Sequence, residues 1–548
     1  MAKQSINIGT SANDGTGSTL REAFDICNDN FTEIYGGTNT AFQFKAEGTN
    51  FTGSLLIGHA TTGTISSAQY NTGVGIGALD ALTTSDNNVA VGYNAGTAIT
   101  TGKENTLVGS GAGDSLTLGE KNVAIGKGAL SAEDTGDKNV AIGHGALQSA
   151  NYDGAAYNVA VGFDAGVLVS TGIQNVIVGG LAADALTTGG GNVAVGDRAL
   201  SLEDTGNYAV AIGYRALTAQ NYDGSSYNVA VGTDAGLSVT TGIYNTLIGG
   251  LAGDALTTGA SNVAIGYGAL STEDGHGKNV AIGYTALFAQ NAGADAYNVA
   301  VGYEAGASVS TGIRNTLIGG LAGDALTQGA YNTAVGMFAL SSETGGGKNT
   351  ALGYGTLELQ NVNDDGNNVA IGYTAGQLIS TGIRNTIVGS LAGDALTTGI
   401  SNTFVGFNAG GAVTDRSYNT AIGDSALSTN VNGARNVAIG NAALATMNPA
   451  SDSDTYNVAI GYDAGTAVTT GIKNTIIGSL AGDALTTGEG STAVGYAALS
   501  TETSGGKNTA IGSKSQNSVN NSGNGNNTSV GFESMSAATT AIGSTAIG

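Results

Sequence analysis

Short runs of alternating apolar and small residues recur along the chain, and most of them read NVAIG or NTLIG. In residues 262–266, the β-branched Val263 and Ile265 alternate with Ala264, a period of two that is typical of a strand with two different faces. We expect Val263 and Ile265 to fill a thin core. Ala264 is then expected to face outward, where its small size lets another layer or another subunit approach closely.

A second apolar segment, Ala269-Leu270, follows the glycine that ends this strand. Two short strands and two turns are therefore predicted to make one coil. A coil of this size cannot bury a core of its own, so its stability has to come from stacking on its neighbours. The pattern thus predicts an all-β protein, an elongated parallel β-solenoid.

The repeats follow a regular rhythm. The first residues of successive units lie 17, 17, 17 and 19 residues apart, which gives a higher period of 70. We count 26 units from Asn88 to Asn527, which would stack to about 125 Å at roughly 4.8 Å per coil. The irregularities are an extra coil near Asn419, a step of 21 after Asn436, and two units that begin with Ala209 and Ser491 instead of asparagine.

Composition agrees with a repetitive fold and narrows the function. The 548 residues include 92 Gly and only one Pro, and 18 Lys and Arg stand against 42 Asp and Glu for a net charge of −24. Without a basic patch, binding to nucleic acid or to an anionic membrane is disfavoured. Cys27 is the single cysteine, so no internal disulfide is expected. No apolar run is long enough for a signal peptide or a membrane span, so no membrane insertion is predicted.

The repeat phrase N-x-A-x-G-x-x-A resembles the head repeats of YadA-type trimeric autotransporter adhesins, over about residues 54 to 548. That resemblance implies a left-handed β-roll, with three chains packed around a common axis as a homotrimer and the small-residue face inward. The coils here are longer than in that family. A right-handed, single-chain β-helix is the alternative fold.

The first 50 residues have a different character. A helix is predicted between the capping residues Thr16 to Thr19 and the glycines at 36 and 37. Its apolar residues are spaced like an a/d seam, which self-association or docking on another protein would bury. Packing of the helix on strands of its own chain is the alternative. The seam residues are Leu20, Phe24, Cys27, Phe31 and Ile34.

The phrase INIGTSANDGTG followed by LREAFDICNDNFTEIY resembles the N-terminal segment of many phage tail-fibre and virion proteins. That resemblance implies that residues 1–50 attach the chain to another virion protein, and that the solenoid, 51–533, projects outward. It also implies synthesis in the host cytoplasm and a place in the virion. Residues 534–548 are expected to form shortened terminal coils.

Two polar registers recur in the repeat, and structural roles are expected for both. The stacked asparagines are predicted to form amide hydrogen bonds along the coils or to occupy left-handed turn positions. The aspartates of the AGDAL phrase are predicted to cap local backbone, because one carboxylate per four coils is too few for a calcium cage. These aspartates are Asp114, Asp184, Asp254, Asp324, Asp394 and Asp483.

No catalytic constellation is visible, and we expect no enzyme, cofactor or metal. The three histidines, His59, His144 and His276, lie in different coils. Carboxylate pairs such as those of glycan-cleaving tailspikes are an alternative. However, Glu203-Asp204 and Glu273-Asp274 recur in equivalent turns, where a charge pair is usually a solvated loop.

Loops of the longer coils are the candidate receptor-facing sites. Tyrosine beside Asp and Asn suits stacking on a sugar ring, although a merely longer turn is the simpler interpretation. Such loops lie about 19 Å apart, so any binding would be weak and multivalent. The loop candidates are Tyr152, Asp153, Tyr222, Asp223, Asp364 and Asp365.

At the far end, Met535, Ile542 and Ile547 are candidates for docking a separate tip protein, because an open solenoid end calls for a cap. Terminal coils that seal themselves across a trimer are the alternative. The sequence as a whole favours a structural phage tail fibre that mediates or supports attachment to the host-cell surface. A bacterial trimeric surface adhesin or a glycan-cleaving tailspike is the alternative function.

Overall fold

The computed structural model describes residues 44–45, 50–58 and 65–548. The predicted helical seam of Leu20, Phe24, Cys27, Phe31 and Ile34 lies outside these residues, as does His59. The chain divides into two compact units, residues 1–245 and 246–548. Every regular element in the described part is a β-strand, and that part contains no helix capable of crossing a lipid bilayer.

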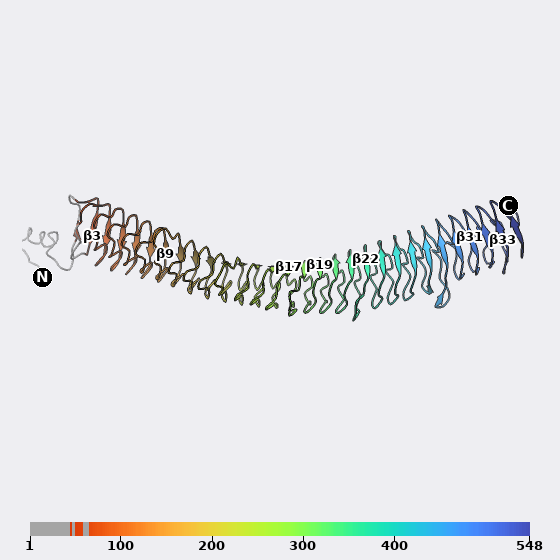
Figure 1. Cartoon of the computed structure of the whole chain (residues 1–548), viewed down its shortest axis with the longest axis horizontal. Helices are drawn as coiled ribbons and strands as arrows, with labels where there is room; N and C mark the ends of the chain where they lie inside the picture. Colours follow the sequence, from red (N-terminus) through yellow and green to blue (C-terminus); the bar gives the residue numbers. More distant parts are fainter. Residues whose placement is uncertain (1–43, 46–49, 59–64) are drawn as a thin grey trace, which may run out of the picture. The chain divides into compact units, whose positions relative to one another are not determined.

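The first unit is a stack of coils, each contributing one short strand to a shared parallel ladder (Figure 1). Val159 pairs with Val176 and Ala160 with Ile177, so neighbouring coils are in register residue for residue. The short β1 instead pairs antiparallel with β3. The strands are β1 (Phe44–Lys45), β2 (Phe51–Thr52), β3 (Leu55–Ile57), β4 (Ala68–Gln69), β5 (Thr72–Val74), β6 (Val89–Val91), β7 (Thr106–Val108), β8 (Val123–Ile125), β9 (Val140–Ile142), β10 (Val159–Val161), β11 (Val176–Val178), β12 (Val193–Val195), β13 (Val210–Ile212) and β14 (Val229–Val231).

The second unit repeats the same architecture, with Val263 paired in parallel to Val280. Its strands are β15 (Thr246–Ile248), β16 (Val263–Ile265), β17 (Val280–Ile282), β18 (Val299–Val301), β19 (Thr316–Ile318), β20 (Thr333–Val335), β21 (Thr350–Leu352), β22 (Val369–Ile371), β23 (Thr386–Val388), β24 (Thr403–Val405), β25 (Thr420–Ile422), β26 (Gly433–Ala434), β27 (Val437–Ile439), β28 (Ser453–Asp454), β29 (Val458–Ile460), β30 (Thr475–Ile477), β31 (Thr492–Val494), β32 (Thr509–Ile511), β33 (Thr528–Val530) and β34 (Thr545–Ile547). The prediction of a parallel β-solenoid is confirmed.

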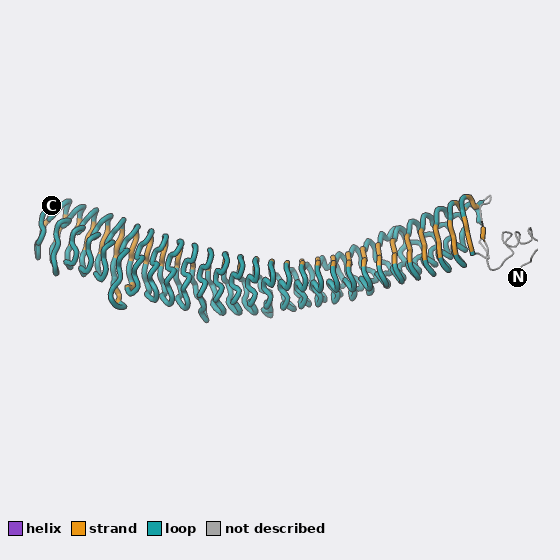
Figure 2. Tube along the Cα trace, turned by 180° about the vertical axis from the view of Figure 1, so that it is seen from behind, coloured by secondary structure: helices purple, strands orange, loops and turns teal. Residues whose placement is uncertain are grey.

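Two details of the coil differ from the prediction. Most coils contain one strand rather than two, and the rest of each coil is turn and loop, as Figure 2 shows. The segment Ala269-Leu270 cannot form a second strand because Leu270 is in the left-handed region, with φ of 54°. Residues 534–548 are not shortened either, since Ser544 follows Asn527 by 17 residues and its amide donates to the Asn527 side chain.

The two strand faces are the reverse of the prediction. Ala264 is fully buried inside the coil, whereas Val263 and Ile265 face outward and are partly exposed. Leu270 also points into the interior and is fully buried, so little space remains beside the strand. An alanine on the strand leaves room for that leucine, so the small residue belongs inside.

Coils with a large inward residue support this explanation. Leu247 takes the place of the inward alanine in β15, and Gly253 takes the place of the buried leucine. A Cβ on Gly253 would lie only 2.8 Å from a methyl carbon of Leu247. In this coil a large strand residue is therefore matched by a glycine in the turn. Where strand and turn residues are both small, as with Ala160 and Gly166, methyl groups of Ile177 and Leu147 from the neighbouring coils fill the space.

Asparagine side chains form a buried ladder along each unit, as predicted. The Oδ1 atom of Asn105 accepts from the amide of Asn122 at 2.9 Å, and its Nδ2 donates to the Gly119 carbonyl at 2.9 Å. The same Nδ2 contacts Oδ1 of Asn88 at 3.0 Å. The left-handed position is not the asparagine but the residue before it, such as Lys121 with φ of 62°. The asparagine side chains thus form hydrogen bonds with backbone groups of the turn, which have no partner in a neighbouring strand.

Candidate functional site

The outward strand face is an apolar surface that recurs in every coil of the ladder. Val176 and Ile248, one from each unit, are typical, with 38% and 37% of their surface exposed. Val or Thr occupies the first outward position of nearly all ladder strands, and Val or Ile the third. Apolar groups that recur in register form a continuous stripe rather than scattered exposed residues.

Aromatic rows border this face. In the second unit, Tyr267, Tyr284 and Tyr303 follow the strand-ending glycines and stack with ring centroids 5.7 and 5.4 Å apart. In the first unit, Tyr227 stacks between Tyr208 and Tyr244 on the opposite flank, immediately before the ladder positions. All six are about half exposed. The aromatic rows widen the apolar stripe on both sides.

Cations share the row that precedes the asparagines. Lys278 lies over the ring of Tyr297 at 5.1 Å and also pairs with Asp295 at 2.5 Å. The hydrogen bond that Lys278 donates to Asp295, and then the one that it donates to Tyr297, raise the pKa of Lys278. Similarly, Arg314 lies 5.3 Å from the ring centroid of Tyr331. Some of the positive charges of this acidic chain therefore lie over tyrosine rings, whereas others, such as Lys103 and Lys473, pair with carboxylates.

Among the residues that the structure describes, five glutamates are fully buried. The expectation that Glu203-Asp204 and Glu273-Asp274 are solvated charge pairs is therefore wrong for the glutamate of each pair, whereas Asp274 is exposed. Each glutamate lies six residues before a ladder position and points into the coil, where the neighbouring regular coil has a core residue such as Leu116. Burial raises the pKa of Glu133, although amide donors from Gly136 and Tyr152 oppose the shift. The buried glutamates are Glu133, Glu203, Glu273, Glu343 and Glu502.

These glutamates hold the longer loops in place. Glu203 accepts hydrogen bonds from the amides of Gly206 at 2.6 Å and Tyr222 at 3.2 Å, and from the side chain of Gln220 at 3.1 Å. Tyr222 belongs to the following coil, which is one of the long ones. All six long coils in the repeat region follow a buried polar residue at this position, which is a glutamate in five cases and Asn430 in the sixth.

The predicted receptor-facing residues lie on these loops but do not form a common site. Tyr152 and Tyr222 are half-buried, and their amides are the ones bound to buried glutamates. The exposed carboxylates pair locally with the preceding coil: Asp153 with Thr135 at 2.7 Å, Asp223 with Thr205 at 3.1 Å, and Asp365 with Lys348 at 2.5 Å. Asp364 and Asp365 line a shallow polar hollow together with Asn363 and Gln328.

Backbone amides contact the AGDAL aspartates, but Oδ1 of Asp114, Asp184, Asp324 and Asp483 is buried with no hydrogen-bond partner among the described residues. Amides of Asp114 itself and of Ser115 contact the Asp114 carboxylate, and burial outweighs these contacts and raises its pKa. Asp254 accepts from the Ser271 hydroxyl at 2.5 Å. Burial likewise raises the pKa of Asp184, Asp324, Asp394 and Asp483.

Apolar side chains are exposed near residue 548, where docking of a tip protein is predicted. Ile542 and Ile547 are 68% and 78% exposed, and Met535 is half-buried in a left-handed conformation with φ of 59°. Ile547 lies in β34, which pairs with β33. The tip protein itself stays a prediction.

No protein-family model matches this sequence, and a search of curated proteins finds none with significant similarity. The repeat geometry therefore carries the functional argument. The functional feature that the sequence analysis missed is the column of buried glutamates. Its signal is visible when coils are aligned, because the position is apolar in regular coils and acidic before long ones.

Proposed function

We propose that this chain is the shaft of a homotrimeric bacteriophage tail fibre, which projects from the virion and supports attachment to the host-cell surface. The observation that carries the proposal is the outward strand face. A row of partly exposed Val, Ile and Thr side chains bordered by tyrosines is an unusual surface for a monomer.

The occupant that best fits this face is a second copy of the chain. Every coil presents the same outward residues at the same spacing, so a copy in the same register meets a matching surface at each step. The face extends over eleven ladder strands of the first unit and eighteen of the second within the described residues. A small buried area per coil therefore adds up to a large interface. Three copies around one axis would bury each face against its neighbours.

The virion location rests on the N-terminal segment. Residues 5–36 resemble the attachment module of phage fibres, and a long stack of rigid coils suits a spacer between a particle and a cell. In this proposal, residues 1–50 bind another virion protein and the coils act mechanically. No catalytic step is assigned to the chain.

Sedimentation of the full chain tests the trimer. The wild type is expected to sediment as a trimer at micromolar concentration. Ile265→Asp combined with Ile282→Asp places charges on the outward face of two adjacent coils and is expected to weaken assembly, with unchanged circular dichroism. Asn363→Asp, on an exposed loop, is the matched control and should remain trimeric. A monomeric wild type would contradict the proposal.

Attachment to the virion is tested separately. The protein is expected in purified particles, and a version lacking residues 1–50 is expected to be absent from them while still forming trimers. Recovery of the truncated chain in particles at the wild-type amount would disprove the attachment role of this segment.

A further inference from the structure

One of the five buried glutamates has different surroundings from the others. Three residues after each of the other four glutamates, the chain has a glycine whose amide donates to the carboxylate, as Gly206 does to Glu203. After Glu273 this position is His276, whose amide donates at 3.1 Å. The other equivalent glycines are Gly136, Gly346 and Gly505.

Glu273 also lacks the donors that satisfy its counterparts. Glu203 and Glu343 each accept from a glutamine side chain in the next coil, at 3.1 and 3.0 Å. Among the described residues, Oε2 of Glu273 has no hydrogen-bond partner, and neither has Nε2 of the corresponding Gln290. An oxygen of a fully buried carboxylate is thus left without compensation, which is costly unless a cation is nearby.

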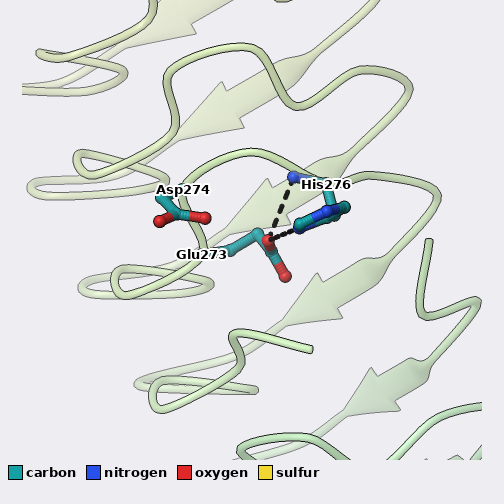
Figure 3. Close-up of side chains that lie close together, drawn as sticks. All are labelled: Glu273, Asp274 and His276. Atoms are coloured by element: carbon teal, nitrogen blue, oxygen red, sulfur yellow. Dashed lines mark hydrogen bonds and ion pairs between the residues drawn. The ribbon is translucent and has the colours of Figure 1, made fainter. Parts of the chain in front are cut away.

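The histidine supplies a second ligand type. Nδ1 of His276 lies 3.6 Å from Oε1 of Glu273, and this nitrogen is also buried without a hydrogen-bond partner among the described residues. Figure 3 shows the two side chains pointing toward one another, with Asp274 beside them. One ligand atom from each of the three residues lies within 4.8 Å of the other two.

We propose that Glu273, Asp274 and His276 bind one divalent transition-metal ion of the Zn²⁺ type. An imidazole nitrogen with two carboxylate oxygens is a ligand set that suits Zn²⁺ and disfavours Ca²⁺, which prefers oxygen ligands alone. Ligand atoms around tetrahedral zinc lie about 3.4 Å apart, given bond lengths near 2.1 Å. The Glu273–His276 separation already fits. Asp274 is exposed, and its Oδ1 accepts from the Gly275 amide at 2.5 Å, so its carboxylate has to turn inward to reach the ion. Three protein ligands leave one coordination position for water or a group from another molecule.

Calorimetric titration of the chelator-treated full chain with ZnCl₂ tests this site. One Zn²⁺ per chain is expected. His276→Gly restores the residue found in the equivalent coils and is expected to weaken binding about tenfold or more while preserving the fold. Glu273→Gln should have a similar effect. His144→Gln is the matched control, because His144 also lies beside a carboxylate, at 3.1 Å from Asp164, but is exposed.

A second measurement separates the site from general affinity of an acidic surface. Co²⁺ bound at one nitrogen and two oxygens gives a visible absorption band, which should appear at one equivalent and be absent in His276→Gly. Zinc binding that is unchanged in both His276→Gly and Glu273→Gln would overturn the proposal. So would the absence of one-to-one binding by the wild type, in which case Glu273 and Gln290 pair as Glu203 and Gln220 do.

Discussion

Regular coils and the coils that precede a long loop differ at one buried position. In a regular coil this position is apolar, and Leu116 fills the interior. One coil further along, the same position is Glu133, and the next coil is two residues longer. The regular coil is held by packing and by the asparagine ladder, whereas the other type needs a buried carboxylate to satisfy amides of the lengthened loop. Extra loop residues thus require a polar partner inside the coil.

The asparagine ladder is weaker at the same places. Nδ2 of Asn139 and of Asn279, which precede long coils, has no hydrogen-bond partner among the described residues. In a regular coil the corresponding carbonyl lies 14 residues further on, as Gly119 does for Asn105. The long loop moves this carbonyl away. In another repeat, Ala209 stands at the equivalent ladder position. Replacing asparagine by alanine costs the least stability at this position, because the side-chain amide donor is already unused there.

The largest expected effect is the loss of a ladder asparagine in a regular coil. Asn105→Ala leaves the amide of Asn122 and the carbonyl of Gly119 unpaired in a buried site. We expect a loss of about 2–6 kcal/mol in the free energy of unfolding, at about 1–3 kcal/mol for each of the two orphaned groups. Hydrogen exchange of the amides in β7 and β8, together with urea unfolding, measures this loss of stability.

Asn139→Ala is the matched substitution before a long coil. It removes one acceptor, for the amide of Asn158 at 3.2 Å, and no satisfied donor. We expect the free energy of unfolding to fall by about half as much as in Asn105→Ala, or less. Equal losses for the two variants would remove the distinction between the two kinds of coil.

The next effect concerns the glutamate itself. Glu203→Leu introduces the residue type of the regular coils and leaves the amides of Gly206 and Tyr222 unpaired, whereas Gln220 keeps its bond to the Ser226 hydroxyl. We therefore expect a loss of about 2–4 kcal/mol in the free energy of unfolding, and faster proteolysis of the lengthened loop. Glu273→Leu removes a single backbone donor contact and, in metal-free protein, should cost clearly less. A larger loss at Glu273 than at Glu203 would show that buried donors do not determine the cost.

The solenoid and its ladder could be predicted because both follow from the spacing of one phrase. Which strand face points inward could not be predicted, because the alternation of Val263, Ala264 and Ile265 defines two faces without showing which one is buried. The interior volume decides it, and that volume depends on Leu270 across the coil. From the sequence, Glu203 is expected in a solvated loop, because a charge pair that recurs in equivalent turns usually faces solvent. Only alignment with the coil of Leu116 shows that it occupies a core position.

A change of pH is expected to have a smaller effect on the stability of the fold. Burial raises the pKa of Glu133 and of the AGDAL aspartate Asp114 above their ordinary values. The folded chain then binds more protons than the unfolded chain between the two pKa values, so stability falls as the pH rises through the folded-state pKa. Urea midpoints are therefore expected to be higher near the ordinary carboxyl pKa than at neutral pH. Glu133→Gln should reduce this dependence, and a dependence of the opposite sign would contradict the assignment.

The smallest effect is expected at the surface tyrosine that closes a long coil. Tyr227 stacks on Tyr208 and Tyr244, and it adopts a left-handed conformation with φ of 49°. Tyr227→Ala loses the stacking, worth about 0.5–1.5 kcal/mol for an aromatic pair, and keeps the backbone strain. Tyr227→Gly loses the same stacking but relieves a left-handed conformation that costs a non-glycine residue about 1–2 kcal/mol.

The glycine variant is therefore expected to match the wild type within about 0.5 kcal/mol, while the alanine variant is less stable by about 1 kcal/mol. Gly191 and Gly490, at the equivalent position of regular coils, have φ of 69° and 70° and need no ring. Thermal unfolding of the two variants side by side measures the difference. If both lose the same stability, the stacked ring rather than the backbone controls this position, and the tyrosine row contributes to the fold of the single chain. If the glycine variant matches the wild type, the row is free to serve the surface between chains.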